Sequence, residues 1–124
     1  MPIRTGYNEQ EGIWEINSDG PIVVDAVIAE LRDIYERLDP TKPLLLLWTT
    51  GDGAGLLESP DLRKLVAFIG ENRPAVGGRS AIVAFDDATY GMGRVAQIYA
   101  EPVAPHLCVF RDGKDAMKWL REGR

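Results

Sequence analysis

The feature that most constrains the fold is an unbroken apolar run, Leu-Leu-Leu-Leu-Trp, at residues 44–48. A run of strand length with a proline before it and glycines after it is typical of a strand covered on both faces. Such strands occur in parallel sheets that carry helices on both sides. We therefore predict an α/β fold in which this segment is a buried, central strand.

The rest of the chain alternates between strand and helix patterns. Two short strands are expected at residues 4–8 and 12–17, joined by the polar turn 9–11 into an antiparallel hairpin. Further buried strands are expected at 81–85 and 107–110. Helical spacing of apolar residues predicts four helices. Their stripes are Val27, Leu31, Ile34 and Leu38; Leu62, Leu65, Val66 and Ile69; Met92, Val95, Ala96 and Tyr99; and Ala116, Met117 and Leu120.

The predicted element order is ββαβαβαβα. Strands separated by one helix pair in parallel through right-handed crossovers, so the sheet should be mostly parallel, with four or five strands and an antiparallel N-terminal edge. A chain of 124 residues without a linker or repeat is expected to form one domain over residues 1–124. In the last helix, Trp119 and Leu120 are expected to be buried anchors against the sheet.

Four segments after residue 79 share a pattern with a known group. They are the strand Arg79-Ser-Ala-Ile-Val-Ala-Phe85, the helix start Tyr90-Gly-Met-Gly-Arg94, the strand end Val109-Phe-Arg-Asp112 and the helix Ala116-Met-Lys-Trp-Leu120. In these segments the chain resembles the bacterial SpoIIAA-like group of STAS/Sec14-type domains. The resemblance implies the fold predicted above. It implies no activity, because the group has no agreed biochemical function.

Regulatory STAS domains, which are similar to this group, carry a phosphorylatable serine in an Asp-Ser-Ser-Gly-Leu segment. The nearest counterpart here is Asp52-Gly-Ala-Gly-Leu56, in which both serines are missing. The comparison implies that a serine phosphoswitch is absent.

Composition excludes several function classes. A net charge of −5 argues against nucleic-acid binding, which depends on clustered Lys and Arg. One histidine and one cysteine are too few ligands for a zinc site in a single chain. Cys108 is expected to be a buried structural thiol, and no cofactor or metal is expected.

The C-terminal helix is an exception to the acidic balance. Lys114, Lys118 and Arg121 share one face of it. That face is expected either to be solvated or to contact an anionic partner or lipid headgroup. No segment approaches the roughly 20 apolar residues that cross a bilayer, and the N-terminus lacks a signal-peptide pattern. We therefore expect a cytoplasmic protein without a transmembrane segment.

Candidate catalytic residues are few. An enzyme would have to rely on Asp86, Asp87, Arg94 or the single His106. The two acids precede a helix, however, where carboxylates are favoured as caps. His106 stands at the entrance to the last strand, where an edge residue is commoner than a general base. Catalysis is therefore the least favoured of the functions considered.

The segment Gly91-Met-Gly93-Arg-Val-Ala96 fits the G-x-G-x-x-A pattern of dinucleotide sites. The pattern argues for a nucleotide only when the first glycine directly follows a strand, and here residues 86–90 intervene. We predict instead that both glycines let a helix start pack closely on neighbouring backbone. An anion on the free N–H groups of that helix start, helped by Arg94, is the alternative.

Two segments should meet at the carboxyl ends of the parallel strands, where α/β sheets form ligand crevices. One is the loop after the apolar run, residues 49–58, whose Leu56 and Leu57 either pack as a lid or line an apolar mouth. The other is the glycine-containing helix start. The predicted ligand-binding residues are Thr49, Thr50, Gly51, Asp52, Gly53, Leu56, Tyr90, Gly91, Gly93 and Arg94.

The resulting functional prediction is a non-enzymatic binding or interaction domain that takes a small lipophilic or anionic ligand. The alternative is a STAS-like regulatory module that binds a protein partner without a phosphoswitch. A ligand site requires apolar walls with a few convergent polar groups, whereas a partner module requires a flat exposed patch.

Overall fold

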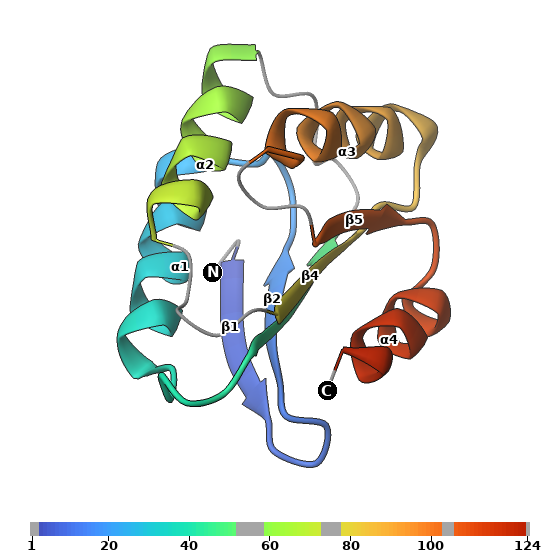
Figure 1. The fold of residues 1–124 in the computed structure, drawn as a ribbon. Coiled ribbons are helices and arrows are strands. Elements are labelled where there is room, and N and C mark those ends of the chain that lie inside the picture. Colours follow the sequence, from blue (N-terminus) through green and yellow to red (C-terminus); the bar gives the residue numbers. More distant parts are fainter. Residues whose placement is uncertain (1–2, 52–58, 73–77, 103–105, 124) are drawn as a thin grey trace.

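The computed structural model describes residues 3–51, 59–72, 78–102 and 106–123. These residues form five strands and four helices in the predicted order (Figure 1). In chain order the elements are β1 (Ile3–Asn8), β2 (Ile13–Ser18), α1 (Val24–Arg37), β3 (Leu44–Thr50), α2 (Ser59–Glu71), β4 (Gly78–Val83), α3 (Asp87–Ala100), β5 (Leu107–Phe110) and α4 (Gly113–Glu122).

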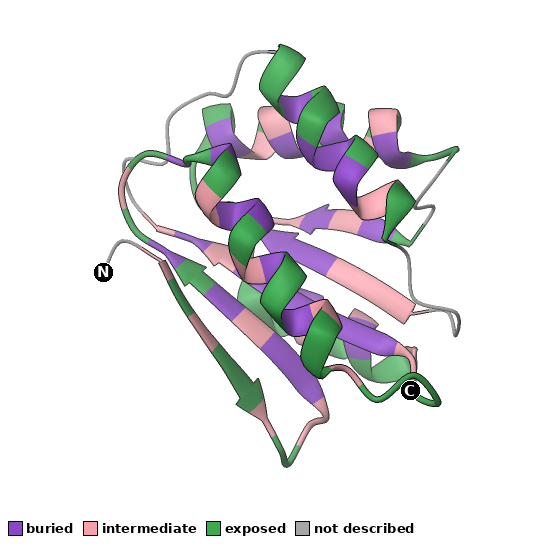
Figure 2. Cartoon of the chain, turned by 90° about the vertical axis from the view of Figure 1, so that its left-hand side faces the viewer, coloured by how far each residue is buried: buried purple, intermediate pink, exposed green. Residues whose placement is uncertain are grey.

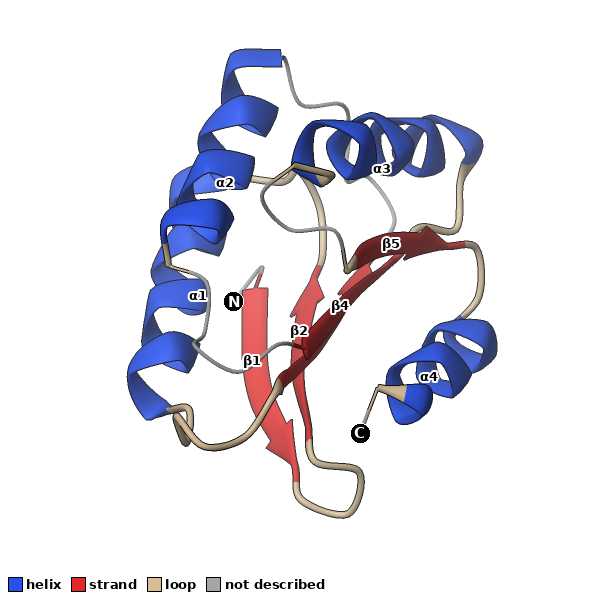
Figure 3. Cartoon of the chain, in the orientation of Figure 1, coloured by secondary structure: helices blue, strands red, loops and turns tan. Residues whose placement is uncertain are grey.

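The five strands form one mixed sheet in the order β1-β2-β3-β4-β5. β1 and β2 pair antiparallel, and the other neighbours pair in parallel. The α/β prediction with an antiparallel N-terminal edge is therefore confirmed. Figure 3 shows α1, α2 and α3 on one side of the sheet and α4 alone on the other.

The larger core lies between the sheet and the three-helix layer. Strand side chains such as Trp14, Leu46 and Trp48 are buried there against Leu31 and Phe68. α4 covers β3, β4 and β5 on the opposite face. The smaller core beneath it consists of Ile13, Leu45, Leu47, Ala81, Val83, Ala116 and Leu120. β3 is buried on both faces, as its unbroken apolar run predicts (Figure 2).

Some predicted boundaries are wrong. The fourth strand ends at Val83 rather than at residue 85, and Phe85 is exposed beyond it. Trp119 was expected to be buried but is half-buried, and Cys108 is also only half-buried. Leu120 is the buried anchor of α4, as predicted.

Hydrogen bonds within short segments explain the hairpin and the last helix. In the hairpin, Gly12 has a φ of 70°, a conformation that favours glycine, and its N–H donates to the Asn8 carbonyl at 2.8 Å. At the start of α4, the Asp112 carboxylate accepts from the N–H groups of Lys114 at 2.7 Å and Asp115 at 3.1 Å.

Candidate functional site

The predicted site starts with two threonines, which lie in β3 and not in a loop. Thr49 and Thr50 continue the strand because their backbones stay in register with Asn17 and Ser18 of β2. Successive strand residues point to opposite faces, so the two side chains cannot line one crevice. The Thr50 hydroxyl, on the three-helix side, is buried and donates to the Val83 carbonyl at 2.8 Å.

Gly51 follows the strand and packs against the protein itself. Its N–H donates to the Ser18 carbonyl at 2.6 Å. A Cβ at this position would lie 2.5 Å from an Asp19 carboxylate oxygen. The close approach that Gly51 permits is therefore with the turn after β2. The predicted site residues Asp52, Gly53 and Leu56 lie outside the described residues.

The predicted helix start at residues 90–94 is wrong. α3 begins at Asp87 and is capped by Asp86, so Tyr90, Gly91, Gly93 and Arg94 lie inside the helix. Their N–H groups are not free for an anion, and the two glycines form no phosphate loop after the strand. The cause is Asp86, whose carboxylate accepts from the Thr89 N–H at 2.7 Å and starts the helix one turn early.

The side chains of these helix residues have local roles. The Arg111 guanidinium lies 5.1 Å from the centre of the half-buried Tyr90 ring. Gly93 is buried against Val109, whereas an added Cβ at the exposed Gly91 would meet nothing within 4 Å. The predicted close backbone packing is therefore wrong for Gly91, and for Gly93 the close neighbour is a side chain. Arg94 is exposed.

A small cavity lies where Thr50, Thr89 and Gly93 meet, and its volume is about 20 Å³. The Thr89 hydroxyl donates to Asp86 at 2.9 Å, and the Thr50 hydroxyl is also in use. A space of this size holds about one water molecule. Among the described residues, this part of the predicted site is therefore packed interior with no room for a ligand.

The remaining candidate residues have structural partners or stand apart. Asp87 pairs with Arg111 at 2.8 Å, and Asp86 caps α3. Burial raises the pKa of the Cys108 thiol, and the charge of Arg94 opposes that effect. His106 is exposed beside β5. No group of three or more His, Cys, Asp or Glu side chains that could hold a metal ion occurs in the described residues.

The Asp86 cap gives a pH-dependent prediction. Hydrogen bonds from the Thr89 N–H and hydroxyl lower the pKa of Asp86. A carboxyl with a lowered folded-state pKa stabilises the fold above its unfolded pKa, and this contribution is lost as the pH falls through the folded value. Asp86→Ala should therefore lower the melting temperature at pH 7, and the difference from the native protein should shrink in acid. Melting curves of both proteins from pH 7 down into acid test this prediction.

The control is Glu36→Ala, at an exposed glutamate. A difference in melting temperature between Asp86→Ala and the native protein that does not change with pH would contradict the role of the charge.

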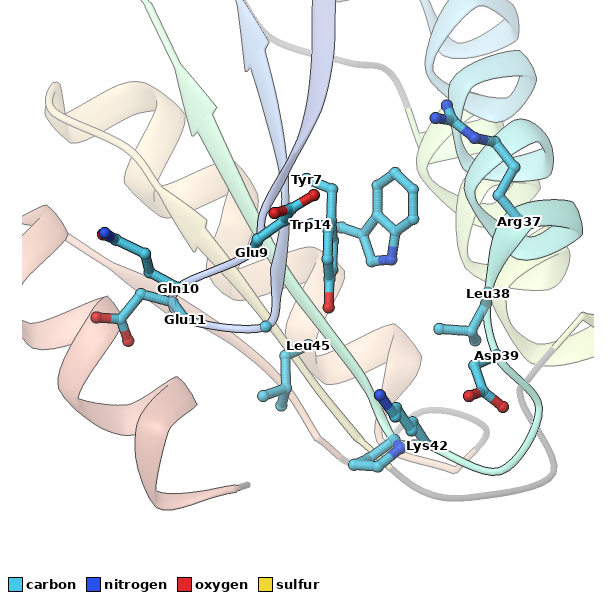
Figure 4. Close-up of a pocket in the computed structure, with 12 residues that line it drawn as sticks. Tyr7, Glu9, Gln10, Glu11, Trp14, Arg37, Leu38, Asp39, Lys42 and Leu45 are labelled. Atoms are coloured by element: carbon cyan, nitrogen blue, oxygen red, sulfur yellow. The ribbon is translucent and has the colours of Figure 1, made fainter.

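A larger cleft lies at the opposite end of the sheet, where the parallel strands begin. It opens between the β1–β2 hairpin and the loop from α1 to β3, and has a volume of about 780 Å³ (Figure 4). The residues around it are Tyr7, Glu9, Gln10, Glu11, Gly12, Trp14, Arg37, Leu38, Asp39, Lys42, Pro43 and Leu45. We call it the hairpin cleft.

Two aromatic rings form one wall of the hairpin cleft. Tyr7 and Trp14 are opposite each other in the β1–β2 register, and their ring centres are 4.8 Å apart at 48°. Trp14 is buried, whereas Tyr7 is 46% exposed. The Arg37 guanidinium lies 5.2 Å from the Trp14 ring centre and pairs with Asp33 at 3.2 Å. The Trp14 ring is therefore in contact with both Tyr7 and Arg37.

The charges around the hairpin cleft differ in how far they are neutralised. Glu11 makes a bidentate pair with Arg121 of α4, at 2.9 and 3.2 Å. Asp39 accepts from the hydroxyl and N–H of Thr41, and these bonds lower its pKa. Lys42 is exposed. Figure 4 shows its ammonium group and the Tyr7 hydroxyl both pointing into the gap.

The sequence prediction missed the hairpin cleft because its residues come from two separated segments, 7–14 and 37–45, with no shared motif. One signal was available: the hairpin register, which places Tyr7 and Trp14 on one face. The contribution of Arg37 and Lys42 depends on where α1 ends relative to the hairpin, which no local pattern encodes.

Comparison with protein-family models, curated proteins and solved structures finds no match to the chain. None of the described helices combines the length and apolar character needed to cross a membrane.

Proposed function

We propose that the chain is a non-enzymatic binding domain that takes a small ligand with a flat apolar body and an anionic group in the hairpin cleft. The observation that carries the proposal is the half-exposed Tyr7 ring, which faces a cleft of small-molecule size and has a lysine ammonium pointing into it. Small-molecule sites combine apolar walls with a few polar groups that orient the ligand.

The walls fit the two parts of such a ligand. A planar group can stack on Tyr7, with Leu38 and Pro43 as further apolar contacts. The anionic group would then lie near Lys42. The ammonium group of Lys42 attracts an anion held at that wall of the cleft. The ligand class is the lipophilic or anionic one expected from the sequence. The site, however, is at the end of the sheet where the parallel strands begin, and not at their carboxyl ends.

The fold supports the resemblance to the SpoIIAA-like group, and we propose membership in it. A mixed five-stranded sheet with helices on both faces is what the resemblance implies. The assignment carries no activity with it, so the ligand proposal depends on the hairpin cleft alone.

The ligand proposal predicts specific binding of 2-naphthoate, a flat apolar carboxylate. In NMR spectra of the indole N–H groups, titration should shift the Trp14 signal, while Trp48, whose indole donates to Ser18 at 2.9 Å, should not move. Lys42→Gln should weaken binding about tenfold, the cost of one charge-assisted contact. Lys118→Gln, at an exposed lysine on α4, is the matched control.

Neutral 2-naphthol tests the two parts of the ligand separately. It should bind more weakly than 2-naphthoate to the native protein, and Lys42→Gln should leave its binding unchanged. Equal weakening by the two lysine variants would contradict a role for Lys42. If neither probe shifts Trp14 at saturating concentration, the hairpin cleft is not the ligand site.

The outward face of α3 favours a second candidate function, a module for a protein partner. Val95 and Ile98 are exposed there, with Ile98 62% accessible, next to Ala88 and Gly91. The solvent side of α4, by contrast, carries Lys114, Lys118 and Arg121. Contiguous exposed apolar patches are typical of protein interaction sites. Failure of both naphthalene probes would make this the better proposal.

A further inference from the structure

The two edges of the sheet differ in how their backbone groups are satisfied. At the β5 edge, the Val109 N–H donates to the side-chain oxygen of Gln97 on α3, at 3.2 Å. At the other edge, β1 is six residues long, and Figure 2 shows no described segment along its outer side. An uncovered edge strand can pair with another strand through its free N–H and C=O groups.

Gly6 in the middle of β1 is not required by the fold of a single chain. Its φ is not positive, and an added Cβ would meet nothing within 4 Å. Glycine within a strand lowers stability and often marks a place where another backbone or ligand approaches closely. Gly6 therefore points to an approach from outside the chain.

We infer that β1 pairs antiparallel with β1 of a second copy, so that two sheets join edge to edge in a symmetric dimer. Opposite residues of paired strands lie on the same face of a sheet, so the register must preserve faces. One such register sets Thr5 opposite Thr5 of the second copy. It places Arg4 opposite Gly6 and Ile3 opposite Tyr7, and the twofold axis repeats each contact.

Charge complementarity favours a second copy as the occupant. Glu15 is the β2 neighbour of Gly6 and lies on the same face as Arg4. In the dimer, Arg4 would cross Gly6 of the second copy, where no side chain is in the way, and reach Glu15 two strands away, about 10 Å between Cα atoms. Within the described part of one chain, the ion pair of Arg4 is a 3.7 Å contact with Asp19, and both side chains are well exposed.

The opposite face of the joined sheet supports the same register. Ile3 is partly buried at the border of the larger core, and Tyr7 is 46% exposed. Their contact would cover apolar surface on both copies. The buried area of one strand pair is small compared with stable interfaces, so the dimer should be weak and concentration-dependent. The dimer needs no ligand, but it contacts the same Tyr7 side chain that lines the hairpin cleft, so its tests are made without ligand.

The test is sedimentation equilibrium of the full chain over a wide concentration range. The native protein should approach twice the monomer mass at high concentration. Arg4→Glu should weaken association about tenfold or more, because two pairs become repulsive. The double variant Arg4→Glu/Glu15→Arg should restore association. Lys118→Glu, an equal charge reversal on α4, should change nothing.

Amide hydrogen exchange tests the interface without relying on variants. Exchange of β1 amides in the native protein should slow as concentration rises, while β5 amides should not change. A monomer at every concentration would overturn the inference. So would a dimer that Arg4→Glu leaves intact, or one that the double variant fails to restore.

Discussion

Replacing Leu120 by alanine should lower the free energy of unfolding by about 3 to 5 kcal/mol, the upper part of the range for buried leucines. Leu120 is fully buried. Among the described helices, only α4 covers the face that holds Ile13, Leu45 and Val83. The neighbours belong to a rigid sheet that cannot collapse into the space, so a cavity should remain. Chemical denaturation with a linear extrapolation measures the change.

Trp119→Ala is the matched comparison in the same helix. The half-buried Trp119 ring lies 5.5 Å from the Phe110 ring centre and 5.0 Å from the Arg79 guanidinium. Its removal should cost about 1 to 2 kcal/mol, because the ring is only partly buried at the border of the smaller core. A larger loss for Trp119→Ala than for Leu120→Ala would show that the Trp119 ring, and not Leu120, is the main anchor of α4.

Two glycines two residues apart in α3 should respond in opposite directions to alanine. Gly93→Ala should destabilise the protein by about 1 to 3 kcal/mol, the usual cost of overpacking. The new Cβ would lie 2.6 Å from a Val109 methyl carbon, and valine has few rotamers to escape. Gly91→Ala should stabilise by about 1 kcal/mol, because the exposed helix position gains propensity without a contact.

Thermal and denaturant unfolding of both variants test this pair directly. The backbone helix preference is the same for both, so the difference between them isolates the contact with Val109. If Gly93→Ala were neutral or stabilising, α3 would be able to move away from β5. The inference that Gly93 packs tightly against Val109 would then be wrong.

The element order was predictable because each signal is local. The run at residues 44–48 could bury all its apolar side chains only between two layers. Helical spacing of apolar residues identified each helix. Hairpin formation followed from the short polar turn, which joins two strands without a crossover. These patterns depend on neighbours a few residues away, and the structure bears them out.

The candidate site was less predictable because it depended on single residues at element ends. Thr49 and Thr50 had no turn residue between them and the apolar run, and pairing with β2 extended the strand through them. Asp86 caps the helix, which therefore begins before the two glycines that were expected to open it. Both errors moved predicted site residues from a loop into regular structure.

The sequence by itself determined the alternation of strands and helices, the antiparallel edge and the two-sided burial of β3, because hydrophobic periodicity and turn chemistry act over short distances. Only the tertiary structure decided that Tyr7 and Trp14 meet Arg37 and Lys42 at one cleft, that Gly93 but not Gly91 is enclosed, and that Gln97 covers one edge of the sheet. These outcomes depend on the distances between packed layers, and such distances result from the sum of many side-chain volumes rather than from any one segment.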